Sequence, residues 1–174
     1  GGRLFEELIR SVILPAFDNQ TLSGLTDSAE LKIDADYICF TTDSYVIKPL
    51  FFSGGDIGKL AVCGTLNDIA VSGAKPIALS MALIIEEGLE IEILRKILIS
   101  AAQTAKKQNV PIICGDTKVV EAGSVDKLFI NTSGIGAKIP QAKLGFKQIS
   151  PGDAIIVSGT IGDHGMTIMS QREG

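Results

Sequence analysis

Residues 54–74 read GGDIGKLAVCGTLNDIAVSGA, a glycine-rich loop that passes directly into an apolar run. The loop opens at Phe51, and the run predicts a helix of about sixteen residues that ends near Gly73. Apolar residues cover almost every side of this helix, so we expect it to be buried. One carboxylate, Asp68, interrupts the run. Because an unpaired carboxylate in a core is costly, a cation or a hydrogen-bond donor is expected beside it.

The segments on either side of this helix alternate between helical and strand patterns. Apolar residues at helical spacing predict a first helix that ends before Pro15, and residues 18–30 are polar and rich in turn formers. The remaining elements that we expect are strands over 37–42, 76–86, 110–114 and 127–135, and a second long helix over 91–105. Because strands and helices interleave, the fold class is α/β or α+β, a mixed sheet with flanking helices.

A second structural unit is expected to open near residue 150. From Asp153 the sequence again reads as a strand, a glycine loop and the start of a helix, and it stops soon afterwards. We therefore expect residues 1–149 to form one complete domain. Residues 150–174 would be the beginning of a second, truncated α/β domain.

Charge and composition disfavour nucleic acid and membranes as partners. The chain carries 16 basic and 20 acidic residues, a net charge of −4, without long runs of one sign. It has no apolar stretch long enough to span a bilayer. Cys39, Cys63 and Cys114 lie far apart in apolar segments, so we expect reduced, buried thiols in a cytoplasmic protein. The single histidine, His164, reads as structural.

Four aspartates stand next to small hydroxyl or amide residues, and we expect them at turns or strand ends: Asp27, Asp43, Asp68 and Asp116. Carboxylates in this setting are typical ligands of Mg²⁺ and of the nucleotide phosphates that travel with it. A Mg-ATP enzyme is therefore the leading interpretation.

Each candidate also has a structural interpretation. Asp56 follows two glycines before a helix, which favours an N-cap. Asp27 and Asp43 could be turn formers that bond their own backbone. Asp116 and Lys118 could lie in an exposed turn at the end of a strand.

Four motifs, taken together, carry a resemblance to a known family. They are residues 40–52 (FTTDSYVIKPLFF), 54–74, 115–120 (GDTKVV) and 157–165 (VSGTIGDHG). The chain resembles the HypE family of hydrogenase maturation factors, within the aminoimidazole-ribonucleotide synthetase (PurM-like) superfamily. The likeness covers nearly the whole chain.

The resemblance implies two α/β domains, a homodimer formed through the sheet of the first domain, and Mg-ATP bound between the domains. Members of the family receive a carbamoyl group from HypF on a C-terminal cysteine. They then use ATP to dehydrate this thiocarboxamide to a thiocyanate. The cyano group passes to a HypC–HypD complex for the iron of nickel-iron hydrogenases. The acceptor cysteine would lie beyond residue 174, so we expect this chain to be inactive alone.

The resemblance also implies roles for particular residues. Lys118 would be catalytic, with its charge near the γ-phosphate or the carbamoyl group. The ligands of Mg²⁺, direct or through water, would be Asp27, Asp43, Asp68 and Asp116. Further nucleotide contacts would come from Lys59, Asn67 and Thr117.

Two other functions remain open at this point. A sister enzyme of the superfamily, such as thiamine-monophosphate kinase or selenophosphate synthetase, would use the same aspartates on another acceptor. A non-catalytic dimerisation module would keep the fold without ATP. The apolar strand over 77–85 offers two hydrophobic faces, which favours a homodimer. The alternative is that the helices over 57–73 and 90–107 cover both faces.

Overall fold

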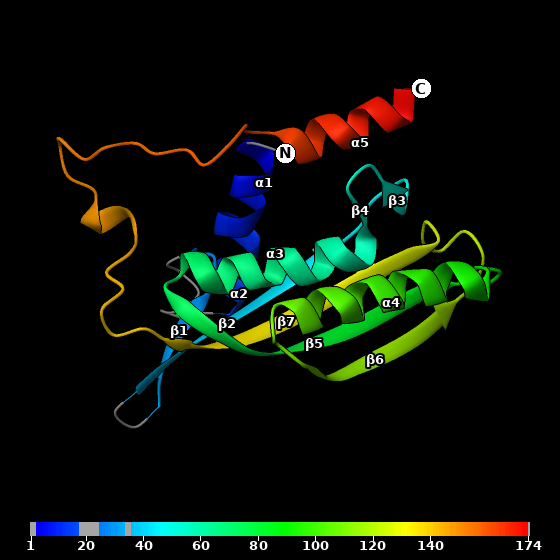
Figure 1. Ribbon diagram of the computed structural model, residues 1–174, viewed down its shortest axis with the longest axis horizontal. Helices are drawn as coiled ribbons and strands as arrows, with labels where there is room; N and C mark the ends of the chain where they lie inside the picture. The colour runs from blue at the N-terminus through cyan, green and yellow to red at the C-terminus, as the bar shows by residue number, and fades with distance from the viewer. Residues whose placement is uncertain (1–2, 18–24, 34–35, 174) are drawn as a thin grey trace.

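A computed structural model describes residues 3–17, 25–33 and 36–173, and its centre is a single large sheet (Figure 1). The five strands lie in the order β1 (Ala29–Ile33), β2 (Asp36–Tyr45), β7 (Leu128–Lys138), β5 (Ala74–Glu86) and β6 (Ile112–Val120). Neighbouring strands are antiparallel except for β5 and β6, which are parallel. The predicted class, a mixed α/β fold, is confirmed.

The remaining elements surround this sheet. Two long helices, α3 (Ile57–Val71) and α4 (Ile91–Lys107), pack against it, and a small hairpin of β3 (Phe51–Phe52) and β4 (Gly55–Asp56) precedes α3. The chain opens with α1 (Arg3–Leu8), the π-helical η1 (Ile9–Ile13) and α2 (Leu14–Phe17). It closes with the 3-10 turn η3 (Phe146–Gln148) and α5 (Asp163–Glu173).

Helix α3 begins and ends close to where the sequence predicts. The Asp56 carboxylate accepts hydrogen bonds from the backbone N–H of Gly58 (2.8 Å) and Lys59 (3.1 Å), so the predicted N-cap is confirmed. The prediction that α3 is buried on almost every side was wrong, because Val71 is 57% exposed and Asn67 is also exposed. The buried residues form one face, which contacts the sheet and α4: Ile57, Gly58, Ala61, Val62, Thr65, Leu66 and Ile69.

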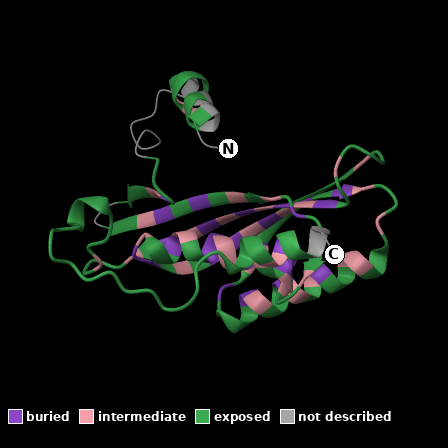
Figure 2. Cartoon of the chain, turned by 90° about the horizontal axis from the view of Figure 1, so that it is seen from above, coloured by how far each residue is buried: buried purple, intermediate pink, exposed green. Residues whose placement is uncertain are grey.

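Both long helices cover the same face of the sheet (Figures 1 and 2). Alternate residues of β5 point into one core cluster with them: Leu79, Met81, Leu83 and Ile85. The other residues of these strands form what we call the open face, defined by Phe40, Thr42, Ser44, Asn131, Ser133, Ala82 and Ile84. Phe40 is 43% and Ile84 39% exposed there. The alternative that the two helices cover both faces is therefore wrong.

Two strands that carry candidate site residues run further than predicted. β2 continues through Asp43 to Tyr45, because each of these residues pairs with one in β7. β6 continues through Asp116 and Lys118 to Val120, because it pairs with β5 as far as Glu86. The positions predicted as strand ends for Asp43 and for Asp116 are therefore wrong. Partner strands that lie far away in the sequence decide where a strand stops.

Three other expectations were also wrong. The first helical segment continues beyond Pro15 to Phe17, because Pro15 falls in a short stretch, α2, that directly follows the π-helical turns of η1. Ala29–Ile33, expected as part of a turn-rich stretch, is strand β1, whereas Gly1, Gly2 and residues 18–24 lie outside the described parts. The strand expected from Asp153 is absent, with Ile155 94% and Ile156 88% exposed, because among the described residues no strand pairs with it.

The three cysteines differ in exposure. All three are free thiols, as predicted, but only Cys39 is buried; Cys63 is half-buried and Cys114 is exposed. Cys114 lies on β6, an edge strand that has a neighbour on one side only, and this explains the wrong prediction for its burial. Within the described parts of the chain, no helix combines the length and the apolar character needed to cross a bilayer.

Candidate functional site

Three of the predicted aspartates lie near one another where α3 packs on β2. Asp68 comes from α3, Asp43 from β2, and Asp27 from the loop before β1. The Thr41 hydroxyl joins these segments: it is 3.0 Å from Asp68 Oδ2 and 2.9 Å from the Asp27 carbonyl oxygen. A hydroxyl has one proton, so it donates to one of these oxygens at a time. We call Asp27, Asp43 and Asp68 the carboxylate cluster.

The loop that carries Asp27 is also tied to the end of α3. The Ser28 hydroxyl donates to Ser72 Oγ at 2.7 Å, and Ser72 Oγ donates to the Asp68 carbonyl oxygen at 2.8 Å. Ser28 is buried although it precedes an exposed strand. These bonds hold the loop against the helix and thereby fix the backbone of Asp27.

The carboxylate cluster concentrates negative charge. Burial raises the pKa of Asp68, and the nearby charges of Asp43 and Asp27 raise it further, while the hydrogen bond from Thr41 lowers it. Within the described parts of the chain, no lysine or arginine forms an ion pair with these three carboxylates. The cluster therefore favours a bound cation.

Mg²⁺ that arrives with a nucleotide fits this donor set. Among the described residues, no three His, Cys, Asp or Glu side chains come close enough to hold a metal ion by themselves. Mg²⁺ in nucleotide sites commonly takes one or two carboxylates and fills its remaining positions with water and phosphate oxygens. The oxygens of Asp43 and Asp68 suit that role better than the role of a closed metal cage.

One carboxylate of the cluster is held by a tyrosine that sequence analysis missed. The Tyr45 hydroxyl is 2.9 Å from Asp43 Oδ2 and 3.3 Å from Thr65 Oγ1. Burial and the neighbouring Asp43 raise the pKa of Tyr45 far above its usual value, despite the opposing bond from Thr65. Thr41 and Tyr45 lie two residues before and after Asp43, so a strand drawn through to Tyr45 would have placed all three on one face.

Within one chain, the other predicted residues lie outside the carboxylate cluster. Asn67 is exposed on α3 next to Asp68. Lys59 lies nine positions earlier on the same helix, about 13 Å along its axis, and its ammonium donates to the Gly54 carbonyl at 2.7 Å. Because Asp56 already caps the first N–H groups of α3, that helix end is not an open anion site.

The residues on β6 lie three strands away from the cluster. The register runs from Asp43 through Thr132 and Met81 to Gly115, a separation of about 14 Å. Asp116 and Lys118 pair with Ala82 and Ile84, which places them on the open face, and their side chains lie 3.7 Å apart. Thr117 lies between them and is exposed. A single chain does not bring these three residues to the cluster.

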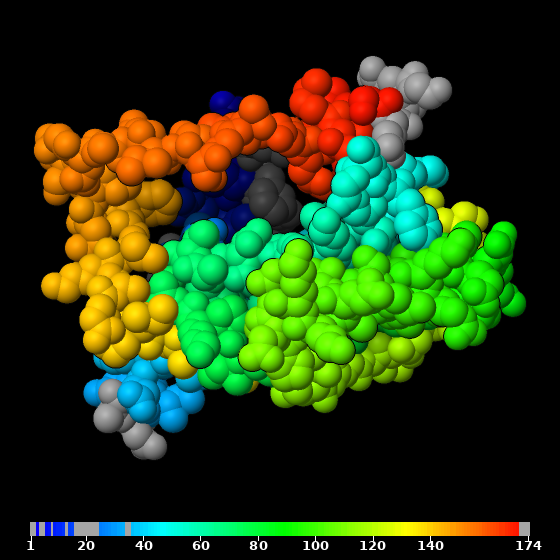
Figure 3. Space-filling view, viewed as in Figure 1, coloured from blue at the N-terminus to red at the C-terminus, as the bar shows by residue number. Residues whose placement is uncertain are grey.

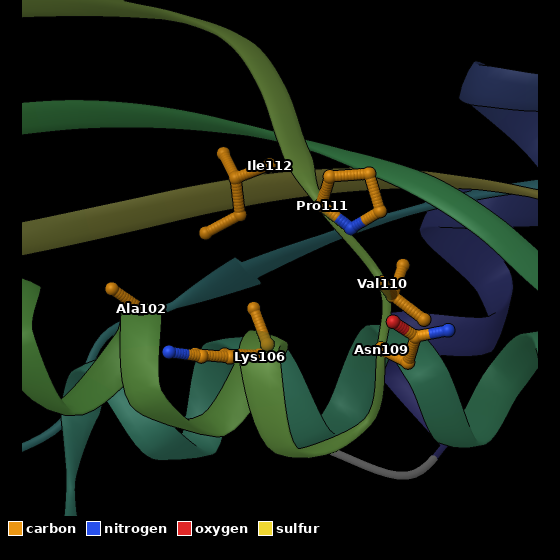
Figure 4. Close-up of a pocket in the computed structure, with 7 residues that line it drawn as sticks. Ala102, Lys106, Asn109, Val110, Pro111 and Ile112 are labelled. Atoms are coloured by element: carbon orange, nitrogen blue, oxygen red, sulfur yellow. The ribbon is translucent and has the colours of Figure 1, made fainter.

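Two hollows on the described surface lie away from the carboxylates. One of about 510 Å³ lies where the end of α4 meets β6, lined by Ala102, Ala105, Lys106, Asn109, Val110, Pro111 and Ile112 (Figure 4). A second, of about 370 Å³, lies along α4 itself. In the space-filling view α4 and α3 lie side by side on the face towards the viewer, and residues 150–162 run apart from both (Figure 3). Among the described residues that line the first hollow, Lys106 is the one that carries a charge.

Comparison with known proteins gives consistent similarities. Residues 25–137 match the family described as AIR synthase related protein, N-terminal domain. The carbamoyl dehydratase HypE of Escherichia coli K12 is 50% identical over 99% of this chain and 53% of its own length.

Two solved structures are also similar. A HypE–HypF complex contains a chain that is 55% identical with a TM-score of 0.88, over 95% of this chain and 53% of that one. HypE in complex with ATP is 47% identical with a TM-score of 0.77, over 100% of this chain and 52% of that one. The chain thus spans about half the length of these relatives.

Proposed function

The chain belongs to the AIR synthase related family, in its HypE branch, and from this premise we propose that it is the nucleotide-binding half of an ATP-dependent carbamoyl dehydratase. The observation that carries the proposal is the carboxylate cluster. Three acidic side chains lie near one another and, among the described residues, have no basic partner, which supports a bound cation. The similarity to a HypE solved with ATP supports the nucleotide.

The reaction that we propose converts the S-carboxamide of a C-terminal cysteine into a thiocyanate. The amide oxygen must become a leaving group, so it takes the γ-phosphoryl group of ATP, and ADP is released. Loss of the two N–H protons and departure of the phosphate then leave the C≡N triple bond. Phosphoryl transfer depends mainly on positioned positive charge around the phosphates. Asp43 and Asp68 would hold Mg²⁺ for this purpose, with Asp27 reaching it through water.

Asp116 and Lys118 require a second copy of the chain in this proposal. Their strand lies about 14 Å from that of Asp43 across the sheet, with β7 and β5 between. We infer a homodimer in which β6 of one copy approaches the nucleotide of the other. Lys118 would then stabilise the developing negative charge, Asp116 would add a metal ligand, and Thr117 would contact the nucleotide. Lys59 and Asn67 would contribute from α3.

The proposed partners follow from the relatives. HypF would supply the carbamoyl group, and the similarity to a HypE–HypF complex supports this. A HypC–HypD complex would accept the cyano group. Residues 1–149 would form the ATP-binding and dimerisation domain and residues 150–174 the start of the second domain, in a cytoplasmic enzyme. A sister kinase or a non-catalytic module is less well supported, because a relative at 50% identity is named carbamoyl dehydratase.

The proposal is tested with Asp68→Asn in the full-length protein. We expect Mg²⁺-dependent ATP consumption to fall by at least about 100-fold, the upper end of the range for residues that merely support a metal ligand. The matched control is Asp36→Asn, an exposed carboxylate at the start of β2. Turnover that is unchanged in folded Asp68→Asn would refute the metal role of the cluster.

A further inference from the structure

The roles proposed above do not include Tyr45. It lies on β2 two residues after Asp43, and its hydroxyl contacts the Asp43 carboxylate (2.9 Å) on one side and Thr65 of α3 (3.3 Å) on the other. The hydroxyl is thus the link between a carboxylate of the candidate site and the buried face of a core helix.

When Asp43 is ionised, the hydrogen bonds that connect Thr65, Tyr45 and Asp43 can run in one direction only. A carboxylate only accepts, so the Tyr45 hydroxyl must donate to it and must itself accept the proton of Thr65. Thr65 Oγ1 in turn contacts Thr132 Oγ1 in the fully buried core. The order is therefore Thr132 to Thr65 to Tyr45 to Asp43, and such chains strengthen each of their bonds.

The surrounding backbone leaves Tyr45 little freedom. A Cβ atom added to Gly64 would overlap the Tyr45 hydroxyl, so the absence of a side chain there is what admits the phenol ring against α3. Thr65 and Thr132 are both 0% exposed, and Thr132 is the residue that pairs with Asp43 across the two strands. Core groups therefore fix the hydroxyl from behind.

We propose that Tyr45 is a positioning residue that fixes the Asp43 carboxylate through Oδ2 and leaves its other oxygen directed for Mg²⁺. This inference rests on the proposed function, because it needs a Mg-nucleotide at the cluster. Groups that orient a metal ligand in this way typically contribute about 10–100-fold to metal affinity. The Asp68 carboxylate accepts a hydrogen bond from the Thr41 hydroxyl, so each of the two half-buried carboxylates has its own supporting hydroxyl.

The test compares Tyr45→Phe with Tyr37→Phe in the full-length protein. Tyr37 is the other tyrosine of the chain; it lies on the same strand and is 43% exposed. Mn²⁺ binding in the presence of a non-hydrolysable ATP analogue is measured by calorimetry, and ATP consumption is measured over a range of Mg²⁺ concentrations. For Tyr45→Phe we expect metal binding about 10–100-fold weaker, with the rate restored at saturating Mg²⁺. Tyr37→Phe should match the wild type.

Thr65→Val is the second variant, in case Tyr45→Phe does not fold. It removes the hydroxyl behind Tyr45, while Thr132 keeps the Ala61 carbonyl at 3.4 Å as a partner. A smaller loss of metal affinity in the same direction is expected. Unchanged metal binding in the folded variants, or a rate that saturating Mg²⁺ does not restore, would overturn the positioning role alone. Failure of the wild type to bind Mn²⁺ with the analogue would overturn the proposed function as well.

Discussion

At the scale of single residues, Glu86 shows how one carboxylate can organise a loop. Oε1 accepts a hydrogen bond from the Gly123 N–H at 2.8 Å, Oε2 accepts one from the Lys127 N–H at 3.2 Å, and the Lys127 ammonium lies 3.6 Å away. These donors, with Gly123 first, hold the pKa of Glu86 below its usual value, against a smaller opposing effect of burial. The loop between β6 and β7 is therefore fastened to the end of β5.

We predict that Glu86→Gln lowers the melting temperature at neutral pH. Because the native pKa is depressed, the stabilisation from Glu86 is fully present above its ordinary pKa of 4.5 and is lost as the pH falls through the lower native value. The difference between variant and wild type should therefore shrink in acid. Thermal unfolding followed by circular dichroism at several pH values measures it, with the exposed neighbour Glu87→Gln as control. A difference that persists unchanged in acid would contradict this account.

Individual residues were predictable where the neighbouring sequence gave a specific signal for their role. Asp68 inside an apolar helix called for a partner, and the structure gives it the Thr41 hydroxyl. Asp56 after two glycines predicted an N-cap, which is present. Tyr45 raised no such conflict, because a tyrosine in a strand is ordinary. Its hydrogen bond to Thr65 depends on how α3 packs over β2, and this packing cannot be read from a single sequence.

At the scale of elements, the cap of α3 offers a direct test. Asp56 is 8% exposed and accepts two backbone N–H bonds. We predict that Asp56→Ala lowers the free energy of unfolding by about 0.5–2 kcal/mol. Urea denaturation measures the change, and Ser53→Ala, at an exposed position in the adjoining loop, serves as the control. Equal stability of the two variants would mean that α3 does not depend on its cap.

Helices were predicted more closely than strands for a physical reason. The ends of α3 and α4 are set by nearby residues, such as the Asp56 cap, and the sequence displays them. The ends of β2 and β6 are set by β7 and β5, whose pairing residues lie up to about 100 positions away. β1 was missed for the same reason, since four of its five residues are exposed and it depends on pairing with β2.

At the scale of the whole molecule, we expect the open face to determine whether the protein dimerises. We predict that the full-length protein is a homodimer and that Ile84→Lys makes it monomeric, because a lysine ammonium buried between two sheets without a partner is costly. Leu83, its neighbour, faces the helices and is 9% exposed, so it is not a suitable probe. Sedimentation velocity gives the mass. Ile99→Lys, on the outer side of α4, should remain dimeric. A monomeric wild type at micromolar concentration would exclude the dimer.

The carboxylate cluster is assembled from the first half of the chain but depends on the second. β2, which carries Asp43, pairs on one side with β7, which ends at Lys138. During synthesis at about 5–20 residues per second, roughly 4–14 s separate the appearance of Asp68 from that of Lys138. Over that interval the nascent chain carries all three acids but lacks the strand that aligns Asp43. In the proposed function, a nascent chain therefore acquires its Mg-nucleotide site only after β7 has been synthesised.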